Sequence, residues 1–311
     1  MQTRLSNRIF CLATFLLPAA AVAGWESVDT SRGAVSIRVP ETPAPLAGRP
    51  LVVLLHGFGS NGTEQDFYFQ LSLPAIGRGF LWAIPNGTEN PDDDRFWNAT
   101  DACCDLYGSG VDDVGFLTEL LDAIEAQYSV DPHRVFFFGH SNGGFMAYRM
   151  ACDRAERVTA IASLAGATFD DPEDCWPDRP VRVLQIHGTA DDTVFYEGGS
   201  LLPGSPTYPG AEETVHTWAG YDGCLQTGVA GTPFDADFTL AGDETAVTTW
   251  SLGCRGPGAE LWTIAGGGHV PFGLTGTFRT RVLDWFTAAG DAIHADGFES
   301  GDVRAWTPAE P

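Results

Sequence analysis

Six runs dominated by apolar residues recur along the chain, each followed within two residues by glycine, histidine or proline. They are residues 51–55, 80–84, 134–138, 160–164, 181–186 and 261–264. Runs of this length and composition are typical of strands buried on both faces, as in a parallel sheet covered by helices. The pattern therefore favours folds built on a central, largely parallel sheet.

Helical patterns separate these runs. The clearest are residues 111–128, 142–153 and 278–288. Strands that alternate with helices predict an α/β fold with a mostly parallel, doubly wound sheet and helices on both faces. Residues 34–39 alternate apolar and polar side chains, which predicts an edge strand. We interpret residues 198–248 as an insertion before the last strand, which either covers a site or is a surface excursion.

The motif Gly139-His140-Ser141-Asn142-Gly143 joins one of the predicted strands directly to a predicted helix. A turn this tight needs small residues around the serine. It lifts the serine hydroxyl out at the carboxyl edge of the sheet, above a helix N-terminus that favours negative charge. An ordinary glycine-rich turn is the alternative, but the strand before and the helix after favour Ser141 as a nucleophile.

A serine hydroxyl is a poor nucleophile without a base, and hydrolases with such a turn carry the residues in the order serine, acid, histidine. The histidines that follow the serine are His187, His216, His269 and His294. His269 follows three glycines after the last apolar run, where a loop can bring an imidazole over the turn. We expect His269 to be the base and His187 to be structural.

The acid should follow a strand that lies between the serine and the histidine in the chain. Asp191 comes soon after the run 181–186 and is the predicted acid, with its neighbour Asp192 as the close alternative. The acid orients the imidazole and stabilises it when it is charged. Less favoured candidates are Asp170, Asp171 and Asp174.

A tetrahedral intermediate needs backbone N–H donors for its oxyanion. We expect one donor to be the Asn142 N–H, directly after the nucleophile, and the other to be the Phe58 N–H, in the glycine-rich loop after an early strand. We expect Trp97, Phe272 and His140 to line the substrate pocket. This chemistry needs no metal and no organic cofactor.

Residues 1–23 have the composition of a secretory signal peptide: arginines, then an apolar run, then small residues ending at Ala23. The apolar run is short for a membrane span. We expect cleavage near Ala23 and a secreted protein, extracellular or periplasmic. The predicted organisation is a catalytic domain over residues 24–290 and a poorly ordered tail over residues 291–311.

Six cysteines follow the predicted cleavage site, an even number that favours disulfides in an oxidising compartment. The expected pairs are Cys224–Cys254, which flank the insertion, Cys152–Cys175, which tie a helix to a later loop, and Cys103–Cys104, which are adjacent. The alternative for the last pair is that one of the two thiols is free. The spacing offers no CxxC pair to begin a zinc site, and we expect no metal site.

The charge of the chain excludes several functions. It has 17 basic and 41 acidic residues, a net charge of −24, and every basic residue is arginine. Such a chain repels phosphate backbones and anionic lipid, so we expect no nucleic-acid or membrane partner. A chain without lysine cannot carry a Walker A loop, a pyridoxal Schiff base or a Ser-Lys dyad.

Several motifs occur together, in order, over roughly residues 35–288. They are Leu54-Leu55-His56-Gly57, Phe96-Trp97-Asn98-Ala99-Thr100, Cys103-Cys104, Gly108-Ser109-Gly110-Val111-Asp112-Asp113-Val114, Gly139-His140-Ser141-Asn142-Gly143-Gly144, His187-Gly188-Thr189-Ala190-Asp191 and Gly266-Gly267-Gly268-His269. As a set they resemble the polyhydroxybutyrate depolymerase-like and feruloyl esterase-like branch of the α/β-hydrolases. The resemblance implies that Ser141, Asp191 and His269 are a catalytic triad and that Cys224–Cys254 is a disulfide. Many relatives have Trp-Pro after the histidine, where this chain has Val270-Pro271-Phe272.

The resemblance implies a secreted serine carboxylic-ester hydrolase that works through an acyl-enzyme on hydroxyalkanoate oligomers, polymer or related esters. A feruloyl or acetyl-xylan esterase is the first alternative. A serine peptidase on the same fold is the second, because acyl transfer to water is common to both. A non-catalytic secreted binding protein is the third, since fold does not imply function.

Overall fold

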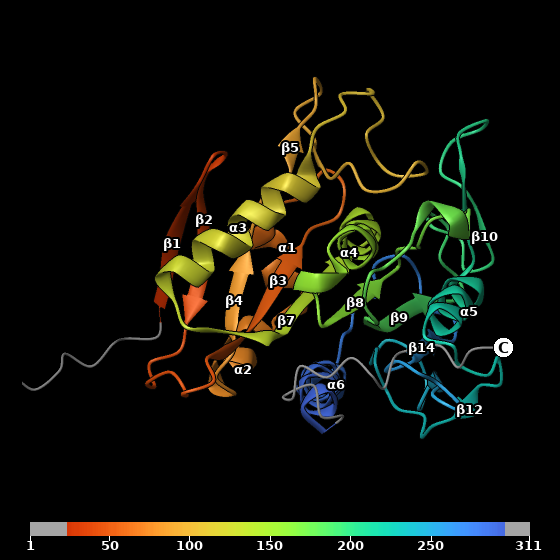
Figure 1. Ribbon diagram of the computed structural model, residues 1–311. Helices are drawn as coiled ribbons and strands as arrows, with labels where there is room; N and C mark the ends of the chain where they lie inside the picture. Colours follow the sequence, from red (N-terminus) through yellow and green to blue (C-terminus); the bar gives the residue numbers. More distant parts are fainter. Residues whose placement is uncertain (1–23, 296–311) are drawn as a thin grey trace, which may run out of the picture.

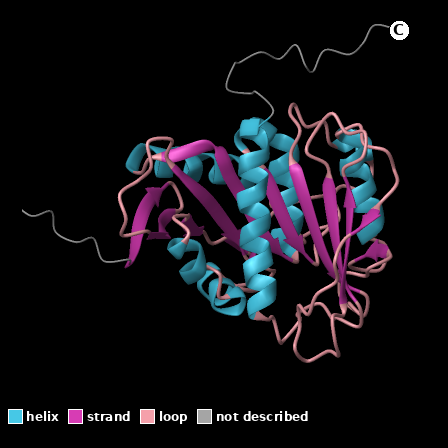
Figure 2. Cartoon of the chain, turned by 90° about the horizontal axis from the view of Figure 1, so that it is seen from below, coloured by secondary structure: helices cyan, strands magenta, loops and turns pink. Residues whose placement is uncertain are grey.

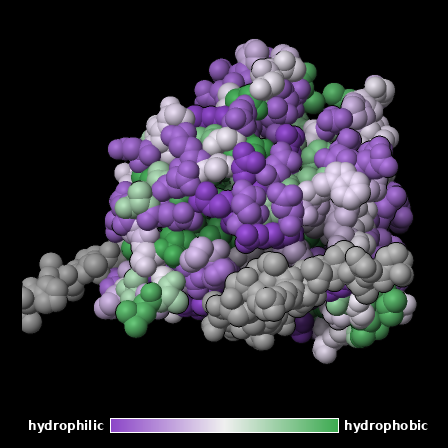
Figure 3. Space-filling model, in the orientation of Figure 1, coloured by the Kyte–Doolittle hydropathy of each residue, from purple (hydrophilic) through white to green (hydrophobic). Residues whose placement is uncertain are grey.

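The computed structural model describes the backbone of residues 24–295 and side chains as far as residue 290. The predicted signal peptide, its cleavage site and residues 296–311 of the predicted tail lie outside the described residues. Within the described part, no helix is both long and apolar enough to cross a membrane. The face seen in Figure 3 is largely hydrophilic, in keeping with the acidic composition.

A ten-stranded sheet crosses the molecule (Figure 1). In spatial order its strands are β1 (Gly24–Thr30), β2 (Gly33–Val39), β4 (Leu81–Ile84), β3 (Arg49–Leu55), β7 (Val130–His140), β8 (Ala160–Leu164), β9 (Arg182–Gly188), β14 (Ala259–Ile264), β13 (Thr245–Trp250) and β12 (Val229–Ala230). The strands from β4 to β14 are parallel. An antiparallel pair extends the sheet at each end.

The six apolar runs of the sequence form these six parallel strands. Their side chains are buried on both faces: Phe136 and Phe138 of β7 pack on one side of the sheet and Phe137 on the other. The expectation for residues 34–39 is half right. They form β2, but β1 pairs outside β2, so β1 and not β2 is the edge strand. Short paired strands lie outside this sheet: β5 (Thr88–Glu89) with β6 (Arg95–Phe96), and β10 (Gly198–Ser200) with β11 (Thr207–Pro209).

Helices cover both faces of the sheet. On one face lie α3 (Asp113–Gln127), α4 (Asn142–Asp153) and α5 (Ala211–Tyr221), and on the other lie α1 (Gly62–Phe69), α2 (Ser72–Gly77) and α6 (Gly276–Ala295). Figure 2, seen from below, shows the long α6 lying across its face of the sheet. One-turn 3₁₀ helices occur at Ala155–Arg157 and Pro172–Asp174. The helix predicted over residues 278–288 extends to Ala295, so residues 291–295 of the predicted tail are helical.

The segment 198–248, interpreted above as an insertion before the last strand, packs against the central sheet. Its helix α5 packs on β9 and β14, and Val215 and Trp218 are part of the core. Its last residues begin β13, which pairs with β14 along its length. The stretch richest in glycine and proline contains the β10–β11 hairpin, whereas α5 covers the sheet and β12 and β13 extend it.

Candidate active site

Ser141 occupies the junction of β7 and α4 in a strained backbone conformation. Its φ is +54° and its ψ is −123°, a backbone conformation that residues other than glycine rarely adopt. A Cβ atom on Gly139 would lie 1.9 Å from the carbonyl oxygen of Gly143, so neither strand nor helix leaves room for a side chain there. The small residues of the motif are what allow the serine to protrude at this edge of the sheet.

His269 lies in the loop between β14 and α6, directly over this serine. Its Nε2 is 2.9 Å from Ser141 Oγ, and its Nδ1 is 2.9 and 3.1 Å from the two carboxylate oxygens of Asp191. Because the carboxylate can only accept, the Nδ1–H donates to Asp191. In the neutral ring, Nε2 is then left to accept the hydrogen bond that the Ser141 hydroxyl donates.

Asp191 follows β9 and is only 5% exposed. One of its oxygens accepts the N–H groups of Thr193 and Val194, each at 2.9 Å. The other lies 3.2 Å from Nε2 of His187, whose ring also donates to the Val194 carbonyl. Burial on its own would raise the pKa of Asp191, but hydrogen bonds from His187 and His269 outweigh it and hold the pKa well below its usual range. The group is therefore a carboxylate at neutral pH.

The structure separates the competing candidates. Asp192 is exposed and its carboxylate accepts a hydrogen bond from the Thr193 hydroxyl, while Asp170, Asp171 and Asp174 line a different cavity. His216 is exposed on α5 and packs against Trp250. The side chain of His294 lies outside the described residues. His187 is buried, as a structural residue would be, but its contact with Asp191 links it directly to the site.

The two expected oxyanion donors come from different elements, α4 and the loop after β3. Asn142 is the first residue of α4, whose N–H has no intrahelical acceptor. In the loop after β3, the Gly59 N–H donates to the Arg95 carbonyl and the Ser60 N–H donates to the Gly57 carbonyl. The Phe58 N–H has no acceptor within the described residues, so it is available to a ligand.

Trp97 does not line the pocket, contrary to the expectation from the sequence. Its side chain is fully buried, and its indole N–H donates to the His56 carbonyl. Its backbone N–H donates to Asn142 Oδ1, and its carbonyl accepts from Asn142 Nδ2. The Asn142 amide also reaches Cys103 Sγ. These hydrogen bonds between Trp97 and Asn142 fix the loop that carries the tryptophan to the residue next to the nucleophile.

A cavity of about 360 Å³ opens beside Ser141 and His269. Its wall comes from the loop after β3, from α1, from the end of β7 and from the loop between β14 and α6. The lining side chains include Phe58, Glu64, Gln65, Tyr68, His140 and Val270. Burial, together with the smaller effect of the neighbouring His269 charge, lowers the pKa of His140 to about 4, so the ring is neutral at neutral pH. Its Nε2–H donates to the His269 carbonyl at 2.9 Å.

Two expectations about this cavity have different outcomes. His140 lines it, as predicted. Phe272 is 89% exposed and lines a neighbouring cavity of about 430 Å³ on the other side of His269. Helix α1, which supplies Gln65 and Tyr68 to the wall, was not predicted from the sequence. Asn61 caps that helix by accepting the Glu64 N–H, and this capping pattern was a readable signal for the helix.

Comparisons with known proteins agree with this geometry. The model of the Esterase family, described as "Putative esterase", matches residues 30–229. The chain belongs to this esterase family. "Putative esterase NocK" of Nocardia uniformis subsp. tsuyamanensis is 29% identical over 78% of this chain and 72% of its own. "Feruloyl esterase B" of Piromyces equi is 30% identical over 71% of this chain, which spans 39% of that protein.

Solved structures give the same fold. The acetyl xylan esterase from Aspergillus awamori has a TM-score of 0.57 at 18% identity, covering 85% of this chain and 99% of that one. The predicted α/β-hydrolase fold and the resemblance to the feruloyl esterase-like branch are confirmed. The protein is a carboxylic-ester hydrolase.

This esterase has three disulfides among its described residues. They join Cys103 to Cys104, Cys152 to Cys175, and Cys224 to Cys254. The first lies under the nucleophile, beside the Asn142 amide. The second ties the end of α4 to the loop after β8, and the third ties the end of α5 to the loop between β13 and β14.

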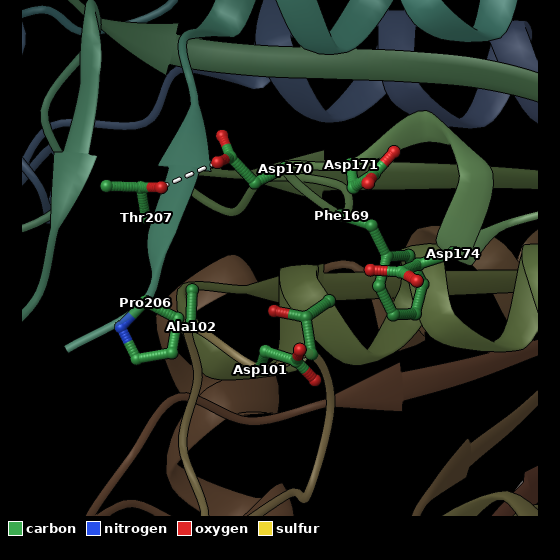
Figure 4. Close-up of a pocket in the computed structure, with 9 residues that line it drawn as sticks. Asp101, Ala102, Phe169, Asp170, Asp171, Asp174, Pro206 and Thr207 are labelled. Atoms are coloured by element: carbon green, nitrogen blue, oxygen red, sulfur yellow. Dashed lines mark hydrogen bonds between the residues drawn. The ribbon is translucent and has the colours of Figure 1, made fainter.

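A third cavity of the esterase, of about 220 Å³, is acidic (Figure 4). Asp101, Asp170, Asp171 and Asp174 contribute carboxylates to its wall, and Thr207 donates a hydrogen bond of 2.6 Å to Asp170. In the part of the chain that the structure describes, no group of three or more such side chains has the geometry to hold a metal ion. This acidic cavity shares no lining residue with the cavity beside Ser141 and His269.

Proposed function

We propose that Ser141, His269 and Asp191 form the catalytic triad of this esterase, with the N–H groups of Phe58 and Asn142 as its oxyanion hole. The observation that carries the proposal is the chain of hydrogen bonds from Ser141 Oγ through the His269 ring to Asp191. It links a nucleophile, a base and a buried carboxylate in the order that acyl transfer requires.

In this mechanism His269 Nε2 takes the proton of Ser141 as Oγ attacks the ester carbonyl carbon. The carbonyl oxygen becomes an oxyanion and accepts hydrogen bonds from the two N–H groups. Asp191 stabilises the imidazolium, which then gives its proton to the departing alcohol. Water, activated by the same imidazole, hydrolyses the acyl-enzyme and releases the acid. Activity falls at low pH because a protonated imidazole cannot act as the base.

For the substrate, we propose hydroxyalkanoate oligomers or polymer and related short hydroxyacyl esters. The cavity beside Ser141 supports this, because it combines apolar groups such as Phe58 and Val270 with the polar side chains of Gln65 and Glu64. A feruloyl or acetyl ester of a polysaccharide is the second candidate, and the names of the relatives support it. We also propose export from the cell, which the disulfides and the composition of residues 1–23 support.

The test is hydrolysis by the purified mature protein, with Ser141→Ala as the control. The panel contains hydroxybutyrate oligomers, methyl ferulate and short p-nitrophenyl esters. We expect turnover that falls about 10⁶-fold, or to background, in Ser141→Ala. The best substrate decides between the two ester classes.

Two further measurements test whether the protein is instead a peptidase or a non-catalytic binding protein. A p-nitroanilide compared with its matching ester separates a peptidase from an esterase. A fluorophosphonate that labels the wild-type protein but not Ser141→Ala supports the nucleophile. Absence of both labelling and ester turnover, in a folded protein, would contradict the proposal and favour a binding protein.

A further inference from the structure

Gln65 is a buried polar side chain beside the nucleophile that the mechanism above does not use. It lies on α1, is 3% exposed, and lines the same cavity as Ser141 and His269. Its backbone N–H is already satisfied by the Asn61 carbonyl. Only the side-chain amide is therefore available to the loop and to the cavity.

The amide oxygen of Gln65 holds the loop that carries the Phe58 N–H. Oε1 accepts the Gly57 N–H at 3.2 Å, in a buried position. Gly57 lies against the nucleophile, since a Cβ atom built on it would be 3.5 Å from Ser141 Cβ and 3.3 Å from His140 Nδ1. The Gly59 N–H, on the other side of Phe58, is held by the Arg95 carbonyl. Gln65 and Arg95 thus anchor the two sides of the expected oxyanion donor.

This hydrogen bond also fixes which way the amide points. The Gly57 N–H is a donor, so the atom facing it must be the oxygen, and the NH₂ group must point elsewhere. Among the residues that the structure describes, none accepts a hydrogen bond from Gln65 Nε2. This donor is open to the cavity, so a ligand that excludes water there has to supply an acceptor for it or leave it unpaired at a cost. The side chain lines the cavity, so a ligand there is the natural partner for this donor.

We propose that Gln65 positions the oxyanion loop through Oε1 and that its NH₂ group donates to an oxygen on the acyl group of the bound ester. The two atoms of one amide are about 2 Å apart by ordinary covalent geometry. The donor therefore lies close to the place where the carbonyl oxygen binds, and its acceptor lies within a few bonds of the scissile carbon. The ligand class is an ester whose acyl group carries a hydroxyl or acyloxy oxygen near the carbonyl.

This inference rests on the proposed triad, and two variants test it. Gln65→Met keeps the approximate length and removes both hydrogen bonds. Gln65→Glu keeps an oxygen for the Gly57 N–H and replaces the donor with an acceptor. The substrates are a matched pair, p-nitrophenyl 3-hydroxybutyrate and p-nitrophenyl butyrate, and rates are expressed per active site after fluorophosphonate titration.

For the positioning role, we expect Gln65→Met to lower kcat on the butyrate ester about tenfold to a hundredfold, with KM within about threefold of wild type. Binding of an alkylboronic acid, which mimics the tetrahedral intermediate, should weaken by a similar factor. For the donor, the preference for the hydroxybutyrate ester in kcat/KM should fall about threefold to tenfold in both variants.

The matched control is Gln127→Met, the same substitution on the exposed end of α3, which should leave both quantities unchanged. An unchanged kcat per active site in Gln65→Met would overturn the positioning role, and an unchanged substrate preference in both variants would overturn the donor. Failure of the triad itself would be distinct, since wild-type protein would then show no turnover sensitive to Ser141→Ala.

Discussion

Two buried aspartates of this esterase, at the ends of different elements, have pKa values shifted in opposite directions. Asp191 follows β9 at the active-site edge, and Asp222 follows α5 at the far side of the sheet; they are 5% and 3% exposed. The pKa of Asp191 lies well below its usual range, whereas burial raises the pKa of Asp222 to about 7. Equal burial therefore does not decide the charge.

The donors around each carboxylate account for the difference. Asp191 meets two imidazoles and two backbone N–H groups, all aimed at its oxygens. Asp222 accepts one N–H with its side chain, from Gly258 at 2.7 Å, which only partly offsets the cost of burial. A buried carboxylate remains charged where the fold supplies several donors, and it takes up a proton more readily where the fold supplies one.

The largest expected effect comes from removing the charge at Asp191. In Asp191→Asn the amide can donate as well as accept, so it no longer enforces the Nδ1–H tautomer or stabilises the imidazolium. We expect kcat/KM on a p-nitrophenyl ester to fall about 10³- to 10⁴-fold, with the fold retained. Steady-state kinetics, with circular dichroism as the check on folding, measure this.

Asp192→Asn is the matched control for that experiment. The side chain is adjacent in sequence but exposed, and it contacts the Thr193 hydroxyl. We expect less than about a twofold change in kcat/KM, since exposed substitutions are nearly neutral. A large loss in Asp192→Asn with activity retained in Asp191→Asn would reverse the assignment of the acid.

The elements of the fold also differ in how far the sequence alone could predict them. The parallel strands are apolar on both faces, so their runs stand out without knowledge of their neighbours. The strands β1 and β13 lie toward the ends of the sheet, where many of their side chains are exposed or only partly buried. Their sequences therefore mix polar and apolar residues and do not stand out. The helix α5 lies in a polar stretch, and its core residues Val215 and Trp218 are recognisable only once β9 and β14 are in place.

The site shows a similar division. Ser141 and His269 could be predicted because local glycine patterns mark the turns that present them. Asp191 could not be separated from Asp192 by sequence, since the choice depends on which side chain points inward from the loop. Trp97 was misassigned because burial under the nucleophile depends on its contacts with Asn142 and His56. Gln65 was missed because its only signal is tertiary: a bond to Gly57, eight residues away on another element.

A second prediction concerns the disulfide beside Asp222. The Cys224–Cys254 disulfide joins residues with a sequence separation of 30. The backbone carbonyl of Asp222 holds the same loop by accepting hydrogen bonds from the N–H groups of Arg255 and Gly256. Opening a loop of that length is expected to cost about 3–4 kcal/mol of unfolding free energy. Urea unfolding of a variant with both cysteines replaced by alanine measures it.

Kinetics sharpen this prediction, because the disulfide is remote from the triad. The double alanine variant should keep kcat/KM within about twofold of wild type well below its melting temperature. An unchanged unfolding free energy would show that Asp222 and its hydrogen bonds hold the loop without help. A large loss of kcat in a fully folded variant would instead connect this side of the sheet to the active site.

The smallest expected effect per step is a pH dependence at Asp222. Its pKa in the folded protein, about 7, is above the ordinary value of 3.8, so the folded state binds more protons than the unfolded state between these values. Its stabilising contribution is complete below 3.8 and is lost as pH rises through about 7. Asp222→Asn mimics the protonated group and cannot ionise. The unfolding free energy of the variant relative to wild type should therefore rise with pH, by about 1.4 kcal/mol for each pH unit within the window.

Urea unfolding at pH 5 and pH 8 tests this sign. We expect Asp222→Asn to gain on wild type at pH 8 compared with pH 5. Asp191→Asn should not show that gain, because the pKa of Asp191 is lowered and its contribution is lost only as pH falls below the ordinary value. A stability difference for Asp222→Asn that is flat from pH 5 to pH 8 would mean that Asp222 ionises normally in its buried position. The single N–H donor of Gly258 would then have to compensate burial as fully as the imidazoles do at Asp191.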